Sequence, residues 1–428
     1  MTFWKTFGFH NVSAIDTLLE RENFTLEDLL EEEELLSECK GQNQKLLDFI
    51  LQPETLSHLM DYLSNTPPSD VPKYPYLACE ILCLDVWDIC EVIYDRPELL
   101  TKLWSFLDRD PPINQYAVRA ASVLMQRKIS ESFNFLQTKE GFVENFLSHI
   151  GDAAITELLM KFISCDEAEG TGIVKWLAEQ KLIVTLVNIF APQSTPDEHE
   201  NVGQALVDII LSDTQGCQIL VEELVSKDVF RTLLEHVTSS GSKSSINWGL
   251  QVVIEVVKRE GGRVHGDNSV PEFIEVCGDF LKPLANIISP ESAGDRINTS
   301  IGEVIPVGIH RLKVVEFFSV LLSQNYEMFD QLLLDLGVFS ACFAMFFTNF
   351  WNNFLHALVT DMFCAFIVNR KPDLTLRLLN DTSLLDQICE AVDENDKSVG
   401  QPKGFSRGYM GFIVNMSNRL VEVGEREE

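Results

Sequence analysis

Apolar residues recur along the chain at the spacing of one face of an α-helix. In three segments they fall at i, i+3, i+4, i+7 and i+8: Ile155 to Ile163, Val202 to Ile210 and Val314 to Leu322. Each set places one apolar stripe on one helix face. Strand signals are scarce, because alternating Val, Thr and Tyr runs are few and no Asn-Gly or Asp-Gly turn joins two of them. The pattern predicts an all-α protein.

A second apolar stripe, with the spacing x, x+1, x+4, x+5 and x+8, occurs seven times. A shift of 47 residues superposes Ile155 to Ile163 on Val202 to Ile210. The same shift superposes the stripe Leu182 to Phe190 on the stripe Val229 to Val237. A helix pair recurring every 40 to 50 residues is the period of HEAT and armadillo arrays, in which stacking creates a continuous core. We therefore expect a HEAT/armadillo-like helical-repeat solenoid forming a single elongated domain. The seven stripes are Leu99 to Leu107, Phe142 to Ile150, Leu182 to Phe190, Val229 to Val237, Phe280 to Ile288, Val338 to Phe346 and Leu384 to Val392.

Composition divides this array into four segments. Residues 1–52 form an acidic N-terminal capping segment, and residues 53–392 the repeat solenoid. Residues 393–408 are polar and Gly-rich, which predicts a mobile linker before a C-terminal helix with a frayed end at 409–428. Thr25-Leu26-Glu27-Asp28 resembles a capping box, and Gly41 is expected to end the helix that this box begins. Pro290 to Pro306 is expected to be a loop between repeats.

The charge balance excludes several kinds of partner. The chain has 33 Lys and Arg against 65 Asp and Glu, a formal net charge of −32. Such a surface repels nucleic-acid phosphates and anionic lipid headgroups, both of which need clustered cations. Between Asp16 and Asp48 eleven acids face three bases. This run is either the solvated face of a capping helix or a docking surface for a basic partner.

Two further features bear on the compartment. Val338 to Val368 is strongly apolar, but Thr, Asn and His residues interrupt it before it reaches the roughly 18 apolar residues of a membrane span, so two buried helices explain it better. The ten cysteines show no regular framework, and no apolar leader follows Met1. A reduced compartment is therefore expected, namely the cytoplasm, with the nucleus as a second location.

A search for catalytic chemistry identifies no catalytic, cofactor-binding or metal-binding residues. Phosphate-binding loop, nucleophile-elbow, HExxH and CxxC motifs are absent from the sequence. Gly170-Thr171-Gly172 is interpreted as a turn, and Cys79 and Cys83, at i and i+4 on an apolar helix, as small hydrophobic residues. The eight histidines are scattered. We therefore expect a protein that is not an enzyme and has no cofactor.

Several sequence blocks occur in a fixed order from residue 3 to about residue 418. They are Phe3-Trp4-Lys5, Thr17 to Glu20 with Thr25-Leu26, Glu38 to Lys40 with Gln42 to Phe49, Lys73 to Pro75 with Ala78 to Leu82, His149 to Gly151 through Cys165, Trp176-Leu177 with Lys181 to Ile183, Trp351 to His356, and Gly408 to Gly411 with Asn418. In residues and order these blocks resemble one family, the SAPS-domain proteins, which are regulatory subunits of the type-2A-like serine/threonine phosphatase called protein phosphatase 6. After the last block, the family's His and basic residues are replaced by Phe412 to Asn415.

The resemblance implies a non-catalytic scaffold that binds the phosphatase catalytic subunit, directs its substrate choice and, in some members, binds an ankyrin-repeat third subunit. The alternative is a generic armadillo-like adaptor without a phosphatase partner; an enzyme with an unrecognised site ranks third. The first contact candidates are Phe3, Trp4 and Lys5, because exposed aromatic residues are typical anchors. The alternative is that these residues cap the first helix pair as a hydrophobic lid. The second candidates are Trp351, Asn352, Asn353 and His356, which form either a partner-contacting ridge or a polar network between helices.

Overall fold

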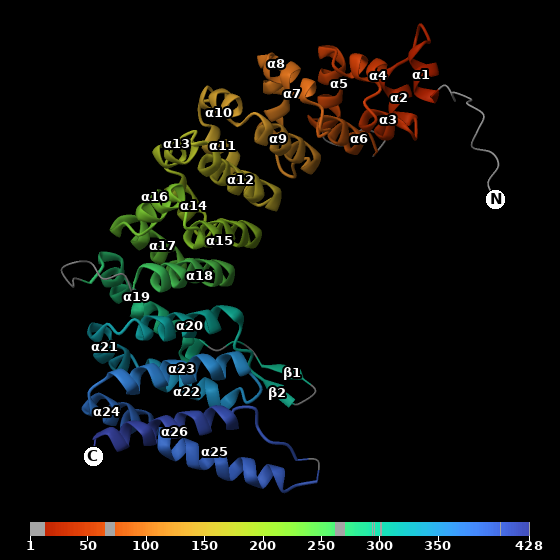
Figure 1. The fold of residues 1–428 in the computed structure, drawn as a ribbon. Helices are drawn as coiled ribbons and strands as arrows, with labels where there is room; N and C mark the ends of the chain where they lie inside the picture. Colours follow the sequence, from red (N-terminus) through yellow and green to blue (C-terminus); the bar gives the residue numbers. More distant parts are fainter. Residues whose placement is uncertain are drawn as a thin grey trace. The chain divides into compact units, whose positions relative to one another are not determined.

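The computed structural model describes residues 13–64, 73–261, 270–292, 294, 296–299, 302–402 and 404–427. Over these residues the chain forms 26 α-helices and one two-stranded hairpin, which confirms the all-α class. The helices gather in two compact units, Met1–Leu182 and Ile183–Glu428, where the sequence predicts one array. Each unit is a stack of short and long helices (Figure 1).

The N-terminal unit begins with four short helices and continues with helical repeats. Its long helices α6, α9 and α12 pack in order, α6 against α9 and α9 against α12, while α5 packs against α6 and α8. The helices are α1 Ala14–Leu19, α2 Leu26–Glu31, α3 Leu35–Lys40, α4 Gln44–Ile50, α5 Pro53–Ser64, α6 Lys73–Leu82, α7 Trp87–Tyr94, α8 Pro97–Trp104, η1 Ser105–Asp108, α9 Gln115–Arg127, α10 Ile129–Gln137, α11 Phe142–Leu147, α12 Ala153–Glu169 and α13 Ile173–Glu179.

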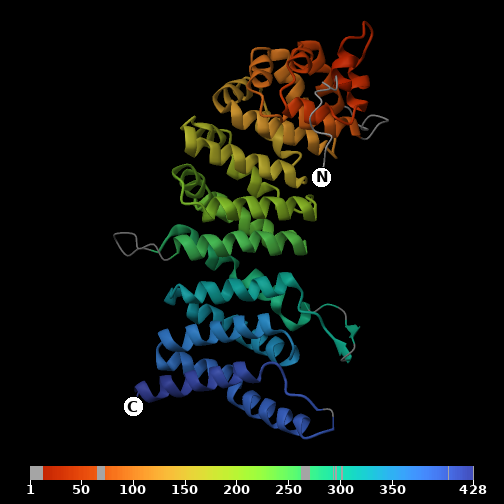
Figure 2. The same cartoon turned by 45° about the vertical axis from the view of Figure 1, so that its right-hand side comes forward.

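The C-terminal unit has the same plan with longer helices. In it α15, α18, α20, α23 and α26 each pack against the next, and α17, α19, α22 and α24 form a second row (Figure 2). Helix α14, Leu182–Asn188, spans the boundary between the units. The other helices are α15 Pro196–Leu211, α16 Gln215–Leu224, α17 Lys227–Ser239, α18 Lys243–Glu260, α19 Glu272–Ile288, η2 Pro290–Ser292, α20 Ile309–Ser323, η3 Glu327–Phe329, α21 Asp330–Asp335, α22 Val338–Thr348, α23 Asn353–Asn369, α24 Pro372–Thr382, α25 Leu384–Val399 and α26 Met410–Glu427.

The apolar stripes form the core, as predicted, in all repeats but the last. Six of the seven stripes are buried throughout, apart from Val229, which is half-buried. In the seventh stripe, on α25, only Leu384 is buried, and Leu385 and Cys389 are exposed. The prediction of a buried stripe is therefore wrong for α25, because this helix buries a different set of residues, Leu384, Ala391 and Asn395.

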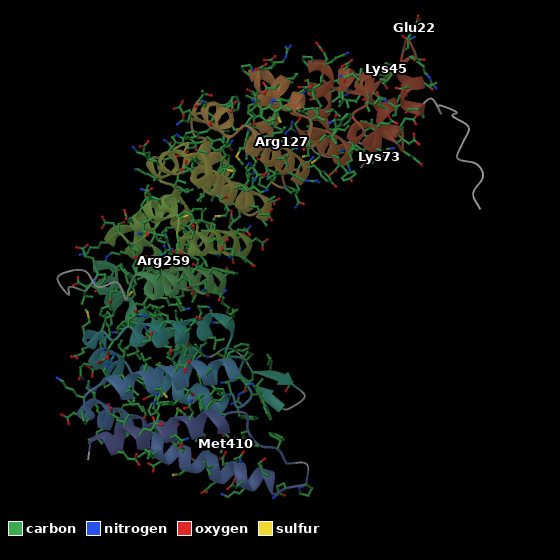
Figure 3. All side chains as sticks on the ribbon, in the orientation of Figure 1. Glu22, Lys45, Lys73, Arg127, Arg259 and Met410 are labelled. Carbon is green, nitrogen blue, oxygen red and sulfur yellow. The ribbon has the colours of Figure 1, made fainter. Side chains whose placement is uncertain are left out.

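Arginines at equivalent places bind one repeat to the previous one. Arg127, at the end of α9, donates to Leu84 O at 2.6 Å and to Cys83 O at 2.9 Å, just after α6. Arg259, near the end of α18, donates to Ser212 O at 2.8 Å, just after α15. These carbonyl oxygens lie just beyond the last turn of each helix, where the helix itself supplies no N–H donor. The two arginines, labelled in Figure 3, thus complete hydrogen bonding at the helix ends inside each unit.

Two local predictions need correction. The Thr25 capping box is confirmed, since Thr25 Oγ1 accepts from the Asp28 amide at 3.2 Å, and Gly41 follows α3 as predicted. The helix between them is not continuous, because Glu32 is extended with ψ 128° and separates α2 from α3. The predicted linker 393–408 begins inside α25, which continues to Val399.

The loop at 290–306 contains the hairpin that the sequence did not predict. Strand β1, Ile297–Thr299, pairs antiparallel with β2, Gly302–Val304, and Ile297 stands opposite Val304. In the described part of the chain no single helix is long and apolar enough to cross a membrane, although the bent pair Glu327–Asp335 and Val338–Thr348 together meets that length and composition.

Candidate functional site

A pocket of about 440 Å³ lies in the C-terminal unit beside the turn between α22 and α23. The end of β2 and the loop after it form one wall, and the turn with the start of α23 forms the other. None of the lining side chains is charged, which sets the pocket apart in a chain with a net charge of −32. The lining residues are Val304, Ile305, Pro306, Val307, Thr348, Asn349, Phe350, Trp351, Asn352, Asn353 and Phe354.

Three of the four residues of the second predicted site line this pocket. Trp351 is 46% exposed, and its ring centroid lies 5.2 Å from that of Phe405. Asn352 is the N-cap of α23, where its Oδ1 accepts from the Leu355 amide at 3.1 Å. Asn353, the first residue of the helix, is exposed. Phe354, which the sequence analysis did not single out, is 78% exposed and adds a second aromatic surface.

His356 does not lie on the surface with these residues. Its side chain is buried, and its Nε2 lies 3.2 Å from Phe346 O, so the ring donates to that carbonyl. Burial lowers the pKa of His356, although the Phe346 and Asn349 carbonyls act in the opposite direction. The imidazole is therefore neutral at pH 7. His356 joins α23 to α22 through this hydrogen bond, and it can influence a partner only through the residues that it positions.

The Gly408 to Gly411 block meets the same turn from the other side. Gly408 N donates to Phe350 O at 3.0 Å, and a Cβ at Gly408 would stand only 2.7 Å from that oxygen. Tyr409 is buried, with its ring 5.7 Å from Phe346 and 5.8 Å from His356. Two blocks more than fifty residues apart in sequence, both of which carry the family resemblance, thus build one support beneath Trp351.

Arg407 borders this support without entering the pocket. Its guanidinium carbon lies 5.0 Å from the Phe350 ring centroid, and its Nη2 lies 3.0 Å from Glu394 Oε2 on α25. The Arg407 amide donates to Asn395 Oδ1 at 2.9 Å. These contacts join the segment before α26, which begins at Met410 (labelled in Figure 3), to α25. The turn that carries Phe350 and Trp351 is therefore held both by Gly408 and by Arg407.

The first predicted site lies outside the described residues. Phe3, Trp4 and Lys5 precede residue 13, where the description begins. The assignment of these residues to partner contact stays a prediction.

Carboxylates of the acidic N-terminal helices partly face their own unit. Glu31 Oε2 accepts from Lys73 Nζ at 2.5 Å and Oε1 from Tyr74 OH at 2.8 Å. The hydrogen bond from Lys73 lowers the pKa of Glu31, with a further contribution from Tyr74. Glu31 is nevertheless exposed, as are Glu33 and Glu34. The acidic run is therefore attached to α6 through Glu31 of α2, and the Glu33 and Glu34 carboxylates face solvent.

The remaining polar clusters of the sequence have structural explanations. Asp166 Oδ1 accepts from Thr171 Oγ1 at 2.8 Å and from Gly172 N at 2.6 Å, and Gly172 has φ 82°, so Gly170 to Gly172 is the turn that was predicted. All ten cysteines are free. Within the described ranges no group of three or more His, Cys, Asp or Glu side chains could hold a metal ion.

Comparison with known proteins assigns a family. Residues 121–428 match the family model described as "SAPS: SIT4 phosphatase-associated protein". The chain is 32% identical to serine/threonine-protein phosphatase 6 regulatory subunit 3-A of Xenopus laevis, over 99% of this chain and 56% of that protein. It is 30% identical to regulatory subunit 1 of Mus musculus, over 99% and 56%, and 29% identical to regulatory subunit 2 of the same species, over 98% and 53%.

The chain spans about half the length of these curated relatives. The family model covers 308 of the 428 residues, including both blocks around Trp351. The resemblance noted in the sequence is thereby confirmed, and the chain belongs to the SAPS family of phosphatase-associated proteins.

Proposed function

We propose that the chain is a non-catalytic regulatory subunit that binds the catalytic subunit of a type-2A-like serine/threonine phosphatase, of the protein phosphatase 6 class, and directs its substrate choice. The observation that carries the proposal is family membership, because the relatives are named regulatory subunits of that phosphatase. The helical repeats support it, since stacked helix pairs offer long surfaces for a folded partner.

The pocket beside Trp351 is the contact that we propose for the catalytic subunit. Trp side chains at the centre of apolar pockets supply a large share of binding energy in protein interfaces. Trp351 and Phe354 expose apolar area, while the uncharged amides of Asn349 and Asn353 line the same pocket and offer hydrogen bonds to a peptide backbone. The chemistry of this pocket suits an uncharged segment with an aromatic or aliphatic anchor.

The net charge of −32 acts at longer range and selects substrates. An acidic surface raises the local concentration of basic proteins and repels acidic ones, mainly through association rates. We expect the phosphatase bound to this chain to favour phosphoproteins with basic surroundings. Because the screening length falls from about 10 Å at 0.1 M salt to about 3 Å at 1 M, this preference weakens as salt rises.

The test is a pull-down of the full chain from cell extract at moderate salt, with mass spectrometry of the retained proteins. Trp351→Ala and Phe354→Ala are compared with Trp87→Ala, a matched control on α7 whose indole is 57% exposed in the other unit. We expect near-stoichiometric catalytic subunit with the wild type and with the control. With the two pocket variants we expect a loss of about tenfold or more, since about 1.4 kcal/mol of contact energy changes affinity tenfold.

The outcomes separate the two parts of the proposal. If the wild type retains other proteins but no phosphatase, the chain is a generic armadillo-like adaptor and the proposed function is wrong. If wild type and pocket variants retain equal amounts of phosphatase, the function stands and the contact lies elsewhere, with Phe3, Trp4 and Lys5 as the next residues to replace. Both arms use the same extract and the same salt.

The proposal extends to a third subunit and to a compartment. We propose an ankyrin-repeat protein as the third member of the complex, following the family resemblance, and the cytoplasm as its main location, with the nucleus second. Free thiols at all ten cysteines accord with a reducing compartment. The same mass spectrometry tests the third subunit, and imaging of the tagged chain tests the location.

A further inference from the structure

Two cysteine side chains lie next to each other at the end of α6. Cys79 Sγ and Cys83 Sγ are 3.9 Å apart, the distance of a weak hydrogen bond between thiols. Both are free thiols. Cys79 is fully buried, as expected of a small hydrophobic residue, but Cys83 is only half-buried. The pair therefore joins an inner sulfur atom to one that solvent reaches.

The backbone geometry permits a bond between the two sulfur atoms. Cys83 N donates to Cys79 O at 2.9 Å, so the two residues keep the i, i+4 register of a helix. This register places both side chains on one face, with the Cα atoms about 6 Å apart. Disulfides span Cα separations of about 4.4–6.8 Å. Because α6 ends at Leu82, Cys83 can turn its side chain towards Cys79 without breaking the helix.

The surroundings of Cys83 favour its thiolate form. The hydrogen bond from the Cys79 thiol lowers the pKa of Cys83. Burial and the Glu80 carboxylate oppose this effect, whereas Arg119 and Arg127 of α9 support it. Arg127 Nη2 also donates to Cys83 O at 2.9 Å, which keeps that guanidinium beside the residue. Since the thiolate is the nucleophilic form of cysteine, Cys83 is the reactive member of the pair.

Other cysteines of the chain lack this combination. Cys277 and Cys342 are fully buried, and burial raises the pKa of each to about 12. Cys389 is exposed, but no second sulfur atom lies within hydrogen-bond distance of it in the described part of the chain. Redox-sensing cysteines combine solvent access, a low pKa and a neighbouring thiol that resolves the oxidised form. The pair on α6 has all three properties.

We propose that Cys79 and Cys83 form a reversible modification site, which hydrogen peroxide oxidises to an intramolecular disulfide. This site lies in the N-terminal unit and does not depend on the proposed phosphatase contact. Transient disulfides of this kind are the ones that occur in reducing compartments.

The reaction has two steps. In the first, the Cys83 thiolate attacks one peroxide oxygen, the O–O bond breaks, and the hydroxide that leaves takes a proton from solvent to become water. Cys83 is then a sulfenic acid. In the second, the Cys79 sulfur attacks the Cys83 sulfur, the S–O bond breaks, and the leaving hydroxyl takes the Cys79 proton to form a second water. The two thiols lose two electrons to the peroxide, and an added dithiol returns them by exchange.

The test is mass spectrometry of the full chain after reduction, removal of the reductant, treatment with hydrogen peroxide and alkylation of the remaining thiols. Cleavage after Glu80 and before Asp85 separates the three cysteines of this region. The resulting peptides carry Cys79, Cys83 and Cys90, so each possible disulfide has its own mass. We expect a link between Cys79 and Cys83, with a loss of about 2 Da that dithiothreitol reverses.

Three variants assign the roles of the thiols. In Cys79→Ala, oxidation should stop at the sulfenic acid of Cys83, a gain of about 16 Da that dimedone traps. In Cys83→Ala, the buried Cys79 should stay reduced. Cys389→Ala, the matched control, removes the exposed cysteine and should leave the yield of the disulfide unchanged. Circular dichroism verifies the helix content of each variant, and the wild-type peptide map tests the proposal even if the buried Cys79→Ala variant fails to fold.

Three results would each overturn the proposal. The first is a wild-type chain in which Cys83 keeps its added oxygen and forms no link to Cys79, which would show that the two sulfur atoms cannot meet. The second is a link from Cys83 to Cys90 or to a second copy of the chain, which would assign a different partner. The third is a pair that stays reduced at a peroxide concentration that oxidises Cys389, which would show that Cys83 is not reactive.

Discussion

The two ends of the described chain treat apolar surface in opposite ways. Before Tyr76, no large hydrophobic side chain among the described residues is exposed. The exposed positions of α1 to α4 are Ala14, Thr17, Asp28, Glu31, Ser37, Lys40, Gln44, Lys45 and Asp48. From Pro372 onwards six such side chains are exposed: Leu376, Leu385, Val399, Phe405, Val414 and Val421. Repeat arrays need polar outer faces at their ends to stay soluble. The described residues before Tyr76 thus keep their large apolar side chains inside, whereas those from Pro372 onwards leave several exposed.

The largest expected effect comes from two adjacent leucines of α25, one buried and one exposed. Leu384 is fully buried and Leu385 is 52% exposed, so the same substitution at each tests the assignment of the two faces. Leu384→Ala should lower the free energy of unfolding by about 2–5 kcal/mol, through lost transfer energy and a cavity. Leu385→Ala should change it by less than about 0.5 kcal/mol.

Urea denaturation followed by far-UV circular dichroism measures both variants. If the two variants lose equal stability, α25 is packed on both sides, which would contradict the exposure of Leu385.

A second prediction concerns the support beneath Trp351. A Cβ at position 408 would stand 2.7 Å from Phe350 O, so Gly408→Ala must push the start of α26 away from the turn. We expect a loss of about 1–3 kcal/mol, as for overpacked cores, and weaker binding at the Trp351 pocket. Gly411→Ala is the control, because nothing lies within 4 Å of its added Cβ and Ala favours helix, which should stabilise by up to about 1 kcal/mol.

Thermal unfolding ranks these two glycine variants. A Gly408→Ala protein as stable as Gly411→Ala would contradict the close approach of residue 408 to the turn.

A third, smaller effect is expected at the N-terminal end of α2. Thr25 Oγ1 caps α2 and Asp28 Oδ2 accepts from the Thr25 amide at 2.9 Å, so Thr25→Ala removes one bond of a capping box. The typical cost of losing such a cap is about 1 kcal/mol. Thr25→Ser keeps the hydroxyl and should restore most of the loss. Hydrogen exchange of α2 amides measures the change locally, and equal exchange in the Ala and Ser variants would refute the cap.

Acidification should weaken the two units at different pH. Burial lowers the pKa of His199, His236, His310 and His356, all in the C-terminal unit. The unfolded chain then binds protons that the folded chain does not, so this stability is present above about pH 6.5 and is lost as pH falls through the folded pKa values. The pKa of Glu31 is lowered by Lys73, so its contribution is present above about pH 4.3 and is lost only below that.

Hydrogen exchange with mass spectrometry at about pH 7, pH 6 and pH 4 follows each unit separately. Loss of protection in the N-terminal unit first would contradict this order. In the C-terminal unit burial raises the pKa of Glu223 and Asp361, so protonation of these carboxyl groups favours the folded state. This effect opposes the destabilisation by the histidines only near the pH at which carboxyl groups titrate.

The repeat architecture was predictable because stacking requires an apolar stripe at a fixed period. The spacing of Ile155 to Ile163 recurs 47 residues later at Val202 to Ile210, and the stripe Leu182 to Phe190 recurs by the same shift at Val229 to Val237. The exposure of Leu385 was not predictable, because a stripe shows which face is apolar and not what covers it. The Trp351 pocket itself was not predicted, although three of its lining residues were candidates from the sequence. Its turn stood out in sequence, but Val304 to Val307 come from a hairpin loop more than forty residues earlier, and no local pattern indicates that approach.

The measurement that tests the central claim most directly is reconstitution of the full chain with a purified protein phosphatase 6-type catalytic subunit, followed by size-exclusion chromatography with light scattering. The proposed regulatory subunit should elute with the catalytic subunit as a 1:1 complex at micromolar concentration, corresponding to about 8 kcal/mol of binding or more. The complex should weaken with Trp351→Ala and persist with Trp87→Ala. Two separate peaks at moderate and low salt would contradict the claim.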